Sequence, residues 1–207
     1  MIDFYTWGTP NGRKVSIMLE ELGVEYNTLP INIGKGEQNS EEFVSINPNS
    51  KIPAIVDHDN QGGSPLKLFE SGAILIYLAE KFNKFLPPHG YDRHKVIQWL
   101  MFQMGGAGPI FGQVHHFLRA APEPVVYAID RYRKETERLY SVLDKHLSAN
   151  EFLATDYSIA DMATYPWIAR HEWHKVDLSD HSNVKRWFSQ IGEREPVARG
   201  MSVPFLN

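Results

Sequence analysis

The chain has 207 residues, of which 43% are hydrophobic and 22% are charged, and this composition excludes a disordered, coiled-coil or collagen-like protein. Its 25 acidic and 21 basic residues give a net charge of −4, so no basic excess exists to bind nucleic acid. There is no cysteine, which excludes a disulfide, a cysteine-ligated metal and a protein thiol nucleophile. Any thiol chemistry must therefore use a thiol that a ligand brings.

Residues 2–5 alternate in polarity and predict a first strand. A turn follows at 8–12, and the apolar residues from Val15 to Leu22 recur at helical spacing. Gly23 is a typical helix end. The chain thus begins with a strand, a turn and a helix.

A second strand is expected at 26–33, and Pro30 favours an edge position for it because proline cannot donate to a neighbouring strand. Residues 55–56 and 66–69 predict a hairpin around Asn60–Gly63. A helix is expected to begin at Ser71. The order is βαβ followed by ββα, which indicates an α/β domain over residues 1–84.

Two prolines within residues 85–90 predict a linker, and residues 91–207 contain no convincing strand. We expect helices at 94–104, interrupted by the glycine-rich run 105–109, and at 126–147. The second domain is therefore expected to be entirely helical.

Ser158 and Asp161 form a capping-box variant at the start of a further helix. The last clear helix covers 183–191, and Pro196 lies just beyond it. No long apolar stretch could span a bilayer, and the N-terminus resembles no signal peptide. We expect a soluble, cytoplasmic protein with no membrane partner.

Ile52-Pro53 is the strongest local candidate for a ligand site. A cis peptide bond is far commoner before proline than elsewhere. A cis bond here would turn the N–H and C=O of Ile52 outward, where they could pair with an extended peptide ligand. The residues alone leave open an ordinary trans proline in a turn.

Glu70 and Ser71 form a second candidate. Ser71 at a helix N-cap offers a hydroxyl and free amides to an anion, and Glu70 offers an acceptor to an ammonium group. Together they suit an amino-acid head group, which carries both charges. An ordinary N-cap beside a solvated acid remains the alternative.

The turn at residues 9–12 is a third candidate, because its donors converge with the positive end of the following helix. Such a site could stabilise a thiolate. Lowering a thiol pKa from ~8.5 by about two units requires ~2.7 kcal/mol. One hydrogen bond to a charged group supplies ~1.5–3 kcal/mol and the helix end ~0.3–1 kcal/mol. A simple capping turn remains the alternative.

Two histidine pairs, His115-His116 and His171 with His174, lack the spacing and companion ligands of a metal site, so no metal is expected. The run from Arg131 to Glu135 is typical of a solvated helix face, although one of its arginines could point into a cleft between the domains.

Taken together, these features resemble a cytosolic glutathione transferase over essentially the whole chain. The general marks are Ile52-Pro53, Glu70-Ser71 and Tyr157–Asp161. Finer features are similar to the nu class, the bacterial disulfide-bond reductases related to the yeast nitrogen-regulatory prion protein. These finer features are Thr9–Gly12, Gly34-Lys35-Gly36-x-Gln38, Asn49 with Lys51–Asp57, and Arg131-Tyr132 followed by Glu135 and Arg138–Tyr140.

The resemblance implies a thioredoxin-like, glutathione-binding N-terminal domain and an all-helical C-terminal substrate domain. It implies that Ile52, before Pro53, pairs by backbone with the cysteinyl part of glutathione. Glu70 and Ser71 would hold the γ-glutamyl end. Gln38 and Lys51 would contact the glutathione backbone or its carboxylate. Thr9 and Asn11 would lie at the sulfur, and Arg131 would close over the site.

The function implied is a glutathione-dependent disulfide-bond reductase whose reactive thiolate belongs to glutathione. The ligand is expected to be reduced glutathione, with one or two molecules per subunit, or oxidised glutathione, and the protein is expected to be a homodimer. One alternative is a transferase or peroxidase acting on small electrophiles or hydroperoxides. Another is a non-catalytic, glutathione-binding regulatory protein.

Overall fold

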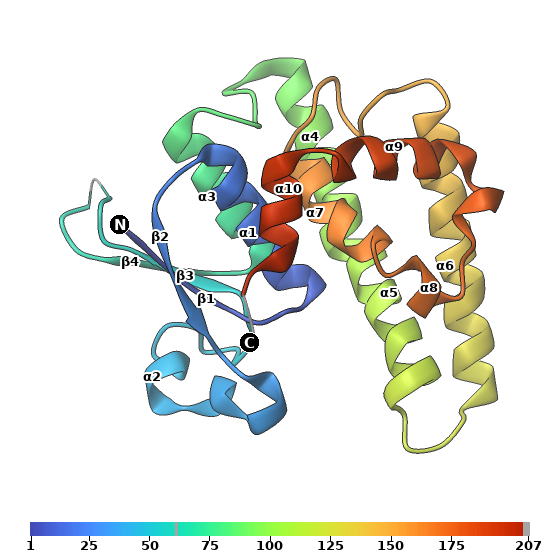
Figure 1. Ribbon diagram of the computed structural model, residues 1–207, viewed down its shortest axis with the longest axis horizontal. Coiled ribbons are helices and arrows are strands. Elements are labelled where there is room, and N and C mark those ends of the chain that lie inside the picture. The colour runs from blue at the N-terminus through green and yellow to red at the C-terminus, as the bar shows by residue number, and fades with distance from the viewer. Residues whose placement is uncertain (61, 205–207) are drawn as a thin grey trace. The chain divides into compact units, whose positions relative to one another are not determined.

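The structure is a computed structural model that describes residues 1–60 and 62–204. The chain forms two compact units (Figure 1). Unit 1 is Met1–Lys84 together with the chain from Arg194, and unit 2 is Phe85–Glu193. Residues 194–204 were expected in the helical domain, but they pack with unit 1. The turn expected at Asn60–Gly63 includes Gln61, which lies outside the described residues.

Unit 1 is built on a four-stranded sheet with the strand order β2-β1-β3-β4. Its elements are β1 (Ile2–Thr6), α1 (Pro10–Leu22), β2 (Tyr26–Pro30), η1 (Ile33–Lys35), η2 (Glu37–Asn39), α2 (Glu41–Val44), β3 (Ala54–Asp57), β4 (Leu66–Phe69), α3 (Ser71–Phe82) and α10 (Glu195–Ser202). β2 is parallel to β1, and the other pairs are antiparallel. The expected hairpin and the edge position of the strand containing Pro30 are confirmed, although this strand ends at Pro30.

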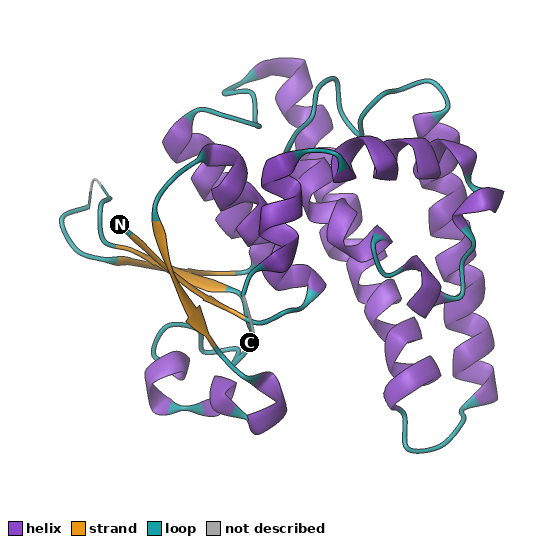
Figure 2. Ribbon diagram, in the orientation of Figure 1, coloured by secondary structure: helices purple, strands orange, loops and turns teal. Residues whose placement is uncertain are grey.

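The two faces of the sheet are covered by different helices, as Figures 1 and 2 show. Alternation along β1 buries Ile2, Phe4 and Thr6 on one side. On the other side Tyr5 meets Phe43 of α2, with ring centroids 6.0 Å apart. α1 and α3 pack against each other, and α3 contacts β3 and β4. This arrangement brings the N-termini of α1 and α3 into one unit.

The last helix, α10, packs along α1 and was missed by the sequence analysis. Ser16 donates to the carbonyl of Gly200 at 2.6 Å, and Arg194 pairs with Glu21 at 2.6 Å. Pro196 was interpreted as following the last helix, but it stands in the first turn of α10. Proline is favoured there because its missing N–H has no intrahelical partner to lose.

Unit 2 is entirely helical in the described part of the chain. Its elements are α4 (Gly90–Phe102), η3 (Gln103–Ala107), α5 (Gly108–His115), η4 (His116–Ala120), α6 (Val126–Leu147), α7 (Ile159–Ile168), α8 (His171–His174), η5 (Leu178–Asp180) and α9 (Ser182–Gly192). α6 has the bounds that its periodicity predicts. In the same described residues, no helix is both long and apolar enough to cross a membrane.

The expected interruption at 105–109 is wrong, because the chain stays helical from α4 into α5 (Figure 2). η3 is a π-helix that widens the turn, and Pro109 stands in the first turn of α5. A π-turn already breaks the i→i−4 ladder, so the missing N–H of Pro109 is tolerated.

The predicted capping box of α7 is confirmed. The Oγ of Ser158 accepts from the amide of Ala160, and the Ser158 amide donates to Asp161 Oδ2 at 3.0 Å. Asp161 also accepts from the indole of Trp187 at 2.9 Å, so this fully buried carboxyl is satisfied on several sides.

Candidate functional site

The N-terminus of α1 is shaped by Thr9, which is its N-cap. The Oγ1 of Thr9 accepts from the amide of Gly12 at 3.2 Å, and this leaves its own hydrogen to donate. A Cβ at Gly12 would lie 2.6 Å from the carbonyl oxygen of Trp7, so glycine lets the helix begin close to β1. Thr9 and Asn11, both half-buried, therefore stand at the positive end of a 13-residue helix.

Gln38 lies in η2, on a loop that is folded by its own side chains. Asn32 Oδ1 accepts from the amides of Gly34 and Lys35, and Glu37 Oε2 accepts from the Asn32 amide at 2.7 Å. The amide oxygen of Gln38 is buried and has no hydrogen-bond partner among the described residues. An unpaired buried acceptor is costly and indicates a missing donor.

The peptide bond between Ile52 and Pro53 is cis, as the ligand-binding interpretation required. The preceding loop is held by buried Asn47, whose Nδ2 donates to the Lys51 carbonyl at 2.5 Å. In the described part of the chain, neither the N–H nor the C=O of Ile52 has a backbone partner. The backbone of Ile52 can therefore accept an extended ligand, while the Lys51 side chain is exposed.

The cap of α3 lies one residue earlier in the chain than expected. Its N-cap is Glu70 and not Ser71, and Glu70 has a φ of +68°, a strained value for a residue with a Cβ. Ser71 is the first helical residue and is buried. The exposed Glu70 carboxylate and the first-turn amides of α3 thus lie next to each other.

Lys14 is a residue that the sequence analysis missed. It is only 1% exposed, and its Nζ donates to the Oγ of Ser71 at 3.3 Å. Burial lowers the pKa of Lys14 to about 7, and the negative charge of Glu70 opposes that shift. Lys14 stands four residues before Met18 and so lies on the apolar face of α1, and this position was the signal in the sequence that could have predicted its burial.

Unit 1 thus contains eight of the nine predicted site residues, and the Lys14 ammonium group donates to one of them, Ser71. They offer two helix N-termini and, as far as the described residues show, a backbone without partners at Ile52 and an amide oxygen without a partner at Gln38. This set fits a short peptide that carries a carboxylate, an ammonium group and a polarisable sulfur.

Arg131, the ninth predicted residue, belongs to unit 2. It is exposed on α6 and lines a hollow of about 910 Å³ together with Tyr127, Lys134 and Arg138. Arg138 forms a two-point ion pair with Glu135, at 2.7 and 2.8 Å, whereas Arg131 has no ion-pair partner within 4.0 Å among the described residues. Its role in glutathione binding stays a prediction.

The chain matches known proteins in both of its units. The family described as glutathione S-transferase, N-terminal domain, matches residues 2–80, and the corresponding C-terminal domain matches residues 110–195. The disulfide-bond oxidoreductase YfcG of Escherichia coli K12 is 47% identical over 203 residues, which are 97% of this chain and 94% of the relative.

Two solved structures are similar along nearly the whole chain. A Pseudomonas putida glutathione transferase with one glutathione disulfide per subunit has a TM-score of 0.94 and 44% identity, covering 98% of this chain and 91% of that one. A Burkholderia graminis glutathione transferase with two glutathione molecules per subunit has a TM-score of 0.93 and 42% identity, covering 100% and 89%. These likenesses confirm the resemblance that the motifs indicated.

Proposed function

Because this chain belongs to the glutathione S-transferase family, we propose that it is a glutathione-dependent disulfide-bond reductase. One observation carries the proposal. The chain has no cysteine, and the capping hydroxyl of Thr9, in the proposed peptide-binding site, stands at a positive helix end. The reactive sulfur then belongs to the ligand, and the protein supplies the donors that keep it ionised.

The assignment of glutathione groups follows the chemistry of each element. Ile52 offers its N–H and C=O to the cysteinyl residue. The α3 N-terminus with Ser71 takes the γ-glutamyl carboxylate, and Glu70 takes its ammonium group. The orphaned oxygen of Gln38 accepts from a peptide N–H, and exposed Lys51 pairs with the glycyl carboxylate.

The proposed reaction consumes two glutathione molecules for each disulfide. The first thiolate displaces one substrate sulfur and forms a mixed disulfide, and the second displaces the other, which gives glutathione disulfide. The two protons that glutathione loses return to the two substrate sulfurs. Two ligands, or one oxidised ligand, per subunit would fit this stoichiometry, and Arg131 is proposed to bind the second.

The experiment compares glutathione-dependent rates on hydroxyethyl disulfide, cumene hydroperoxide and chlorodinitrobenzene. The disulfide should be the fastest substrate. Replacing Thr9 and Asn11 together by Ala should lower that rate about 100-fold, the loss typical of removing donors to a developing or full negative charge. Thr28→Ala, at an exposed position on β2, serves as the control.

If chlorodinitrobenzene or cumene hydroperoxide is turned over faster than the disulfide, the main activity is conjugation or peroxide reduction and not disulfide reduction. Glutathione binding without turnover of any substrate would favour a regulatory role. A rate unchanged in the double variant would contradict the role of Thr9 and Asn11 but leave the disulfide preference to be judged separately.

We also propose a homodimer in the cytoplasm. The support for the compartment is chemical, because the reaction runs forward only where the glutathione pool is kept reduced. The support for the dimer is the family. Light scattering on the purified chain and fractionation of cells that produce it test the two statements.

A further inference from the structure

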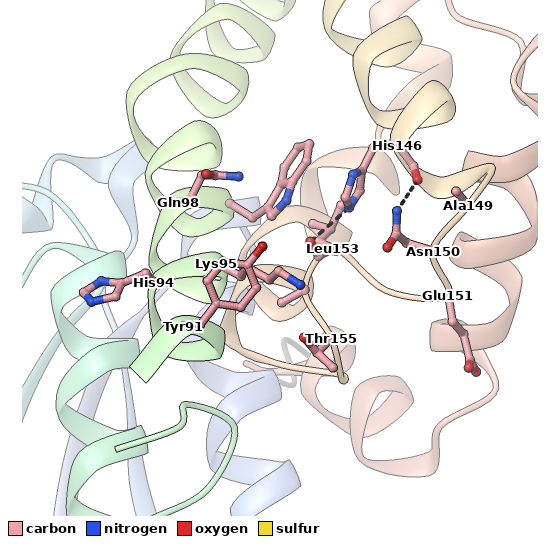
Figure 3. A pocket seen from close by; sticks show the side chains of 12 residues that line it. Tyr91, His94, Lys95, Gln98, His146, Ala149, Asn150, Glu151, Leu153 and Thr155 are labelled. Atoms are coloured by element: carbon pink, nitrogen blue, oxygen red, sulfur yellow. Dashed lines mark hydrogen bonds between the residues drawn. The ribbon is translucent and has the colours of Figure 1, made fainter. Parts of the chain in front are cut away.

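Unit 2 carries two clusters of rings and polar side chains, and they differ in how far the protein itself satisfies them. In the cluster at the end of α6, His146 Nε2 lies 3.1 Å from the carbonyl oxygen of Leu153, and Asn150 Nδ2 donates to the carbonyl of His146 at 2.8 Å (Figure 3). The second cluster lies where η4 ends and α8 begins, and its cations have no acceptor among the described residues.

The second cluster is built on the half-buried indole of Trp173, which carries two guanidinium groups. Arg119 Cζ lies over the Trp173 ring at 4.0 Å from its centroid, and Arg170 Cζ lies over it at 4.1 Å. Arg119 stands in η4 and Arg170 is the N-cap residue of α8, and the packing of α8 against α5 brings these segments together (Figure 1). The electron-rich ring attracts each cation, so the indole holds both guanidinium groups in place.

Neither guanidinium group has an anionic partner among the described residues. No carboxylate oxygen of these residues lies within 4.0 Å of Arg119 or Arg170, and neither side chain donates a hydrogen bond to them. The Nε of Arg170 is buried and has no acceptor there. The indole N–H of Trp173 likewise donates to no described residue. The cluster thus has donors on three side chains and no acceptor for them, and unpaired buried donors are costly.

The uncompensated charge of the two cations is felt by each other and by a neighbouring ring. Burial and the positive charge of Arg119 lower the pKa of Arg170. Burial and the charges of Arg170 and Arg119 lower the pKa of His115 to about 4, so this imidazole stays neutral. Glu172, next to Trp173 in the chain, is exposed and forms no ion pair with either guanidinium. The cluster therefore keeps a positive charge that a bound anion would neutralise.

We propose that Arg119, Arg170 and Trp173 bind a phosphate group, either as the free ion or as a small monoester. Each guanidinium offers a planar fork of N–H donors that matches phosphate oxygens, and the indole N–H adds a donor on the same ring. A tetrahedral dianion has oxygens for all three groups, whereas a single guanidinium already satisfies a planar carboxylate. The proposed glutathione reaction uses none of these residues, so either proposal can fail without the other.

The test titrates inorganic phosphate at pH 8 into the full chain, with acetate at equal ionic strength as the matched planar anion. The indole N–H signal of Trp173, assigned with Trp173→Phe, is followed by heteronuclear NMR. Phosphate should shift this signal saturably, and acetate should bind at least tenfold more weakly. Phosphoserine serves as a second probe. Tighter binding of phosphoserine would support a monoester as the ligand, and tighter binding of phosphate would support the free ion.

Variants of the two arginines test their roles directly. Arg119→Gln and Arg170→Gln should each weaken phosphate binding about tenfold, and the double variant should weaken it about 100-fold. Arg119 is exposed, so its replacement keeps the proposal testable even if replacing the half-buried Arg170 unfolds the chain. Arg133→Gln removes the same charge at an exposed position of α6 and should change nothing.

The proposal is overturned if the Trp173 signal does not respond saturably to phosphate, or if acetate binds as tightly as phosphate does. It is also overturned if Arg119→Gln and Arg133→Gln bind phosphate alike. Displacement of phosphate by oxidised glutathione would assign the cluster to glutathione instead and would likewise reject an independent phosphate site.

Discussion

The ammonium group of Lys14 lies 3.3 Å from the hydroxyl of Ser71, in the interior of unit 1. A buried cation directly beneath the first residue of α3 stabilises negative charge placed at that helix end. Burial lowers the pKa of Lys14 to about 7, so near neutral pH the free protein holds this group partly deprotonated. A carboxylate bound at α3 favours the charged form and raises that pKa.

The first prediction is that oxidised glutathione binds with uptake of a proton between pH 7 and 8. Oxidised glutathione has no thiol, so no proton release from sulfur obscures the signal. Calorimetry in two buffers of different ionisation enthalpy measures the uptake, which for a lysine whose pKa starts near 7 should be roughly half a proton at pH 7 and should rise toward one at pH 8.

Lys14→Met should abolish that uptake and weaken binding about tenfold. The same variant should be more stable at pH 6.5 by about 1–2 kcal/mol, because a buried charge is replaced by an apolar side chain of similar size. Lys35→Met changes the same charge at an exposed position and should alter neither quantity. Proton uptake that persists in Lys14→Met would show that another group titrates.

A second prediction concerns the orphaned oxygen of Gln38. Gln38→Ala should weaken glutathione binding about five- to tenfold, since one hydrogen bond contributes ~1–1.5 kcal/mol. It should not destabilise the free protein, because the oxygen has no partner there among the described residues. Asn39→Ala, at the exposed neighbouring position, is the control. Equal losses of stability and affinity in Gln38→Ala would mean that the residue merely shapes the loop.

Local signals in the sequence predicted much of the fold. The helix of 126–147, the αL stop at Gly23 and the capping box of Ser158 each depend on contacts within a few residues, and each is found in the structure. Elements whose formation depends on contacts between residues far apart in the chain were harder to predict. Pro196 is compatible with both the end and the start of a helix, and only packing on α1 decides for α10.

The site shows the same division. Thr9 and Glu70-Ser71 stand at helix starts, which turn chemistry and charge reveal. Lys14 is different, because a lysine in a helix reads as a solvated residue until a second helix covers it. The functional meaning of Ile52-Pro53 came from the family resemblance, since its residues alone were also compatible with a trans turn.

A third prediction tests the place of α10 in unit 1. A Cβ at Gly200 would lie 2.6 Å from the Cα of Ile17 and 2.7 Å from its amide nitrogen, both of which are backbone atoms. Gly200→Ala should therefore separate α10 from α1 and destabilise the protein by about 1–3 kcal/mol. Urea unfolding measures this change, with Ala198→Ser as a control at an exposed position of the same helix, where the expected cost is only about 0.5 kcal/mol. A variant as stable as the parent would contradict this close approach.

A fourth prediction concerns acid stability and the stacked rings of His115 and His174, whose centroids are 4.5 Å apart. The phenol of Tyr140 lies 2.8 Å from His174 Nδ1, and burial raises the pKa of this phenol, so it stays protonated and donates. Burial lowers the pKa of His115 to about 4 and that of His174 to about 2. Both imidazoles are therefore neutral in the folded protein.

In the unfolded chain each of the two imidazoles takes up a proton near pH 6.5, whereas in the folded protein each does so only at a much lower pH. The free energy of unfolding is thus unaffected by these histidines above pH 6.5. It falls as the pH drops toward 4, by up to ~1.4 kcal/mol per pH unit for each histidine. Urea unfolding at pH 7, 6 and 5 should show a shallower fall in His115→Gln than in the parent.

His116→Gln supplies the matched control, because His116 is the exposed neighbour on the same helical segment and should leave the slope unchanged. Burial raises the pKa of Asp161 to about 6, which gives a slope of opposite sign, but this contribution is common to all three proteins and cancels in the comparison. If His115→Gln and His116→Gln change the pH dependence equally, the stacked pair of His115 and His174 does not set the acid limit of this fold.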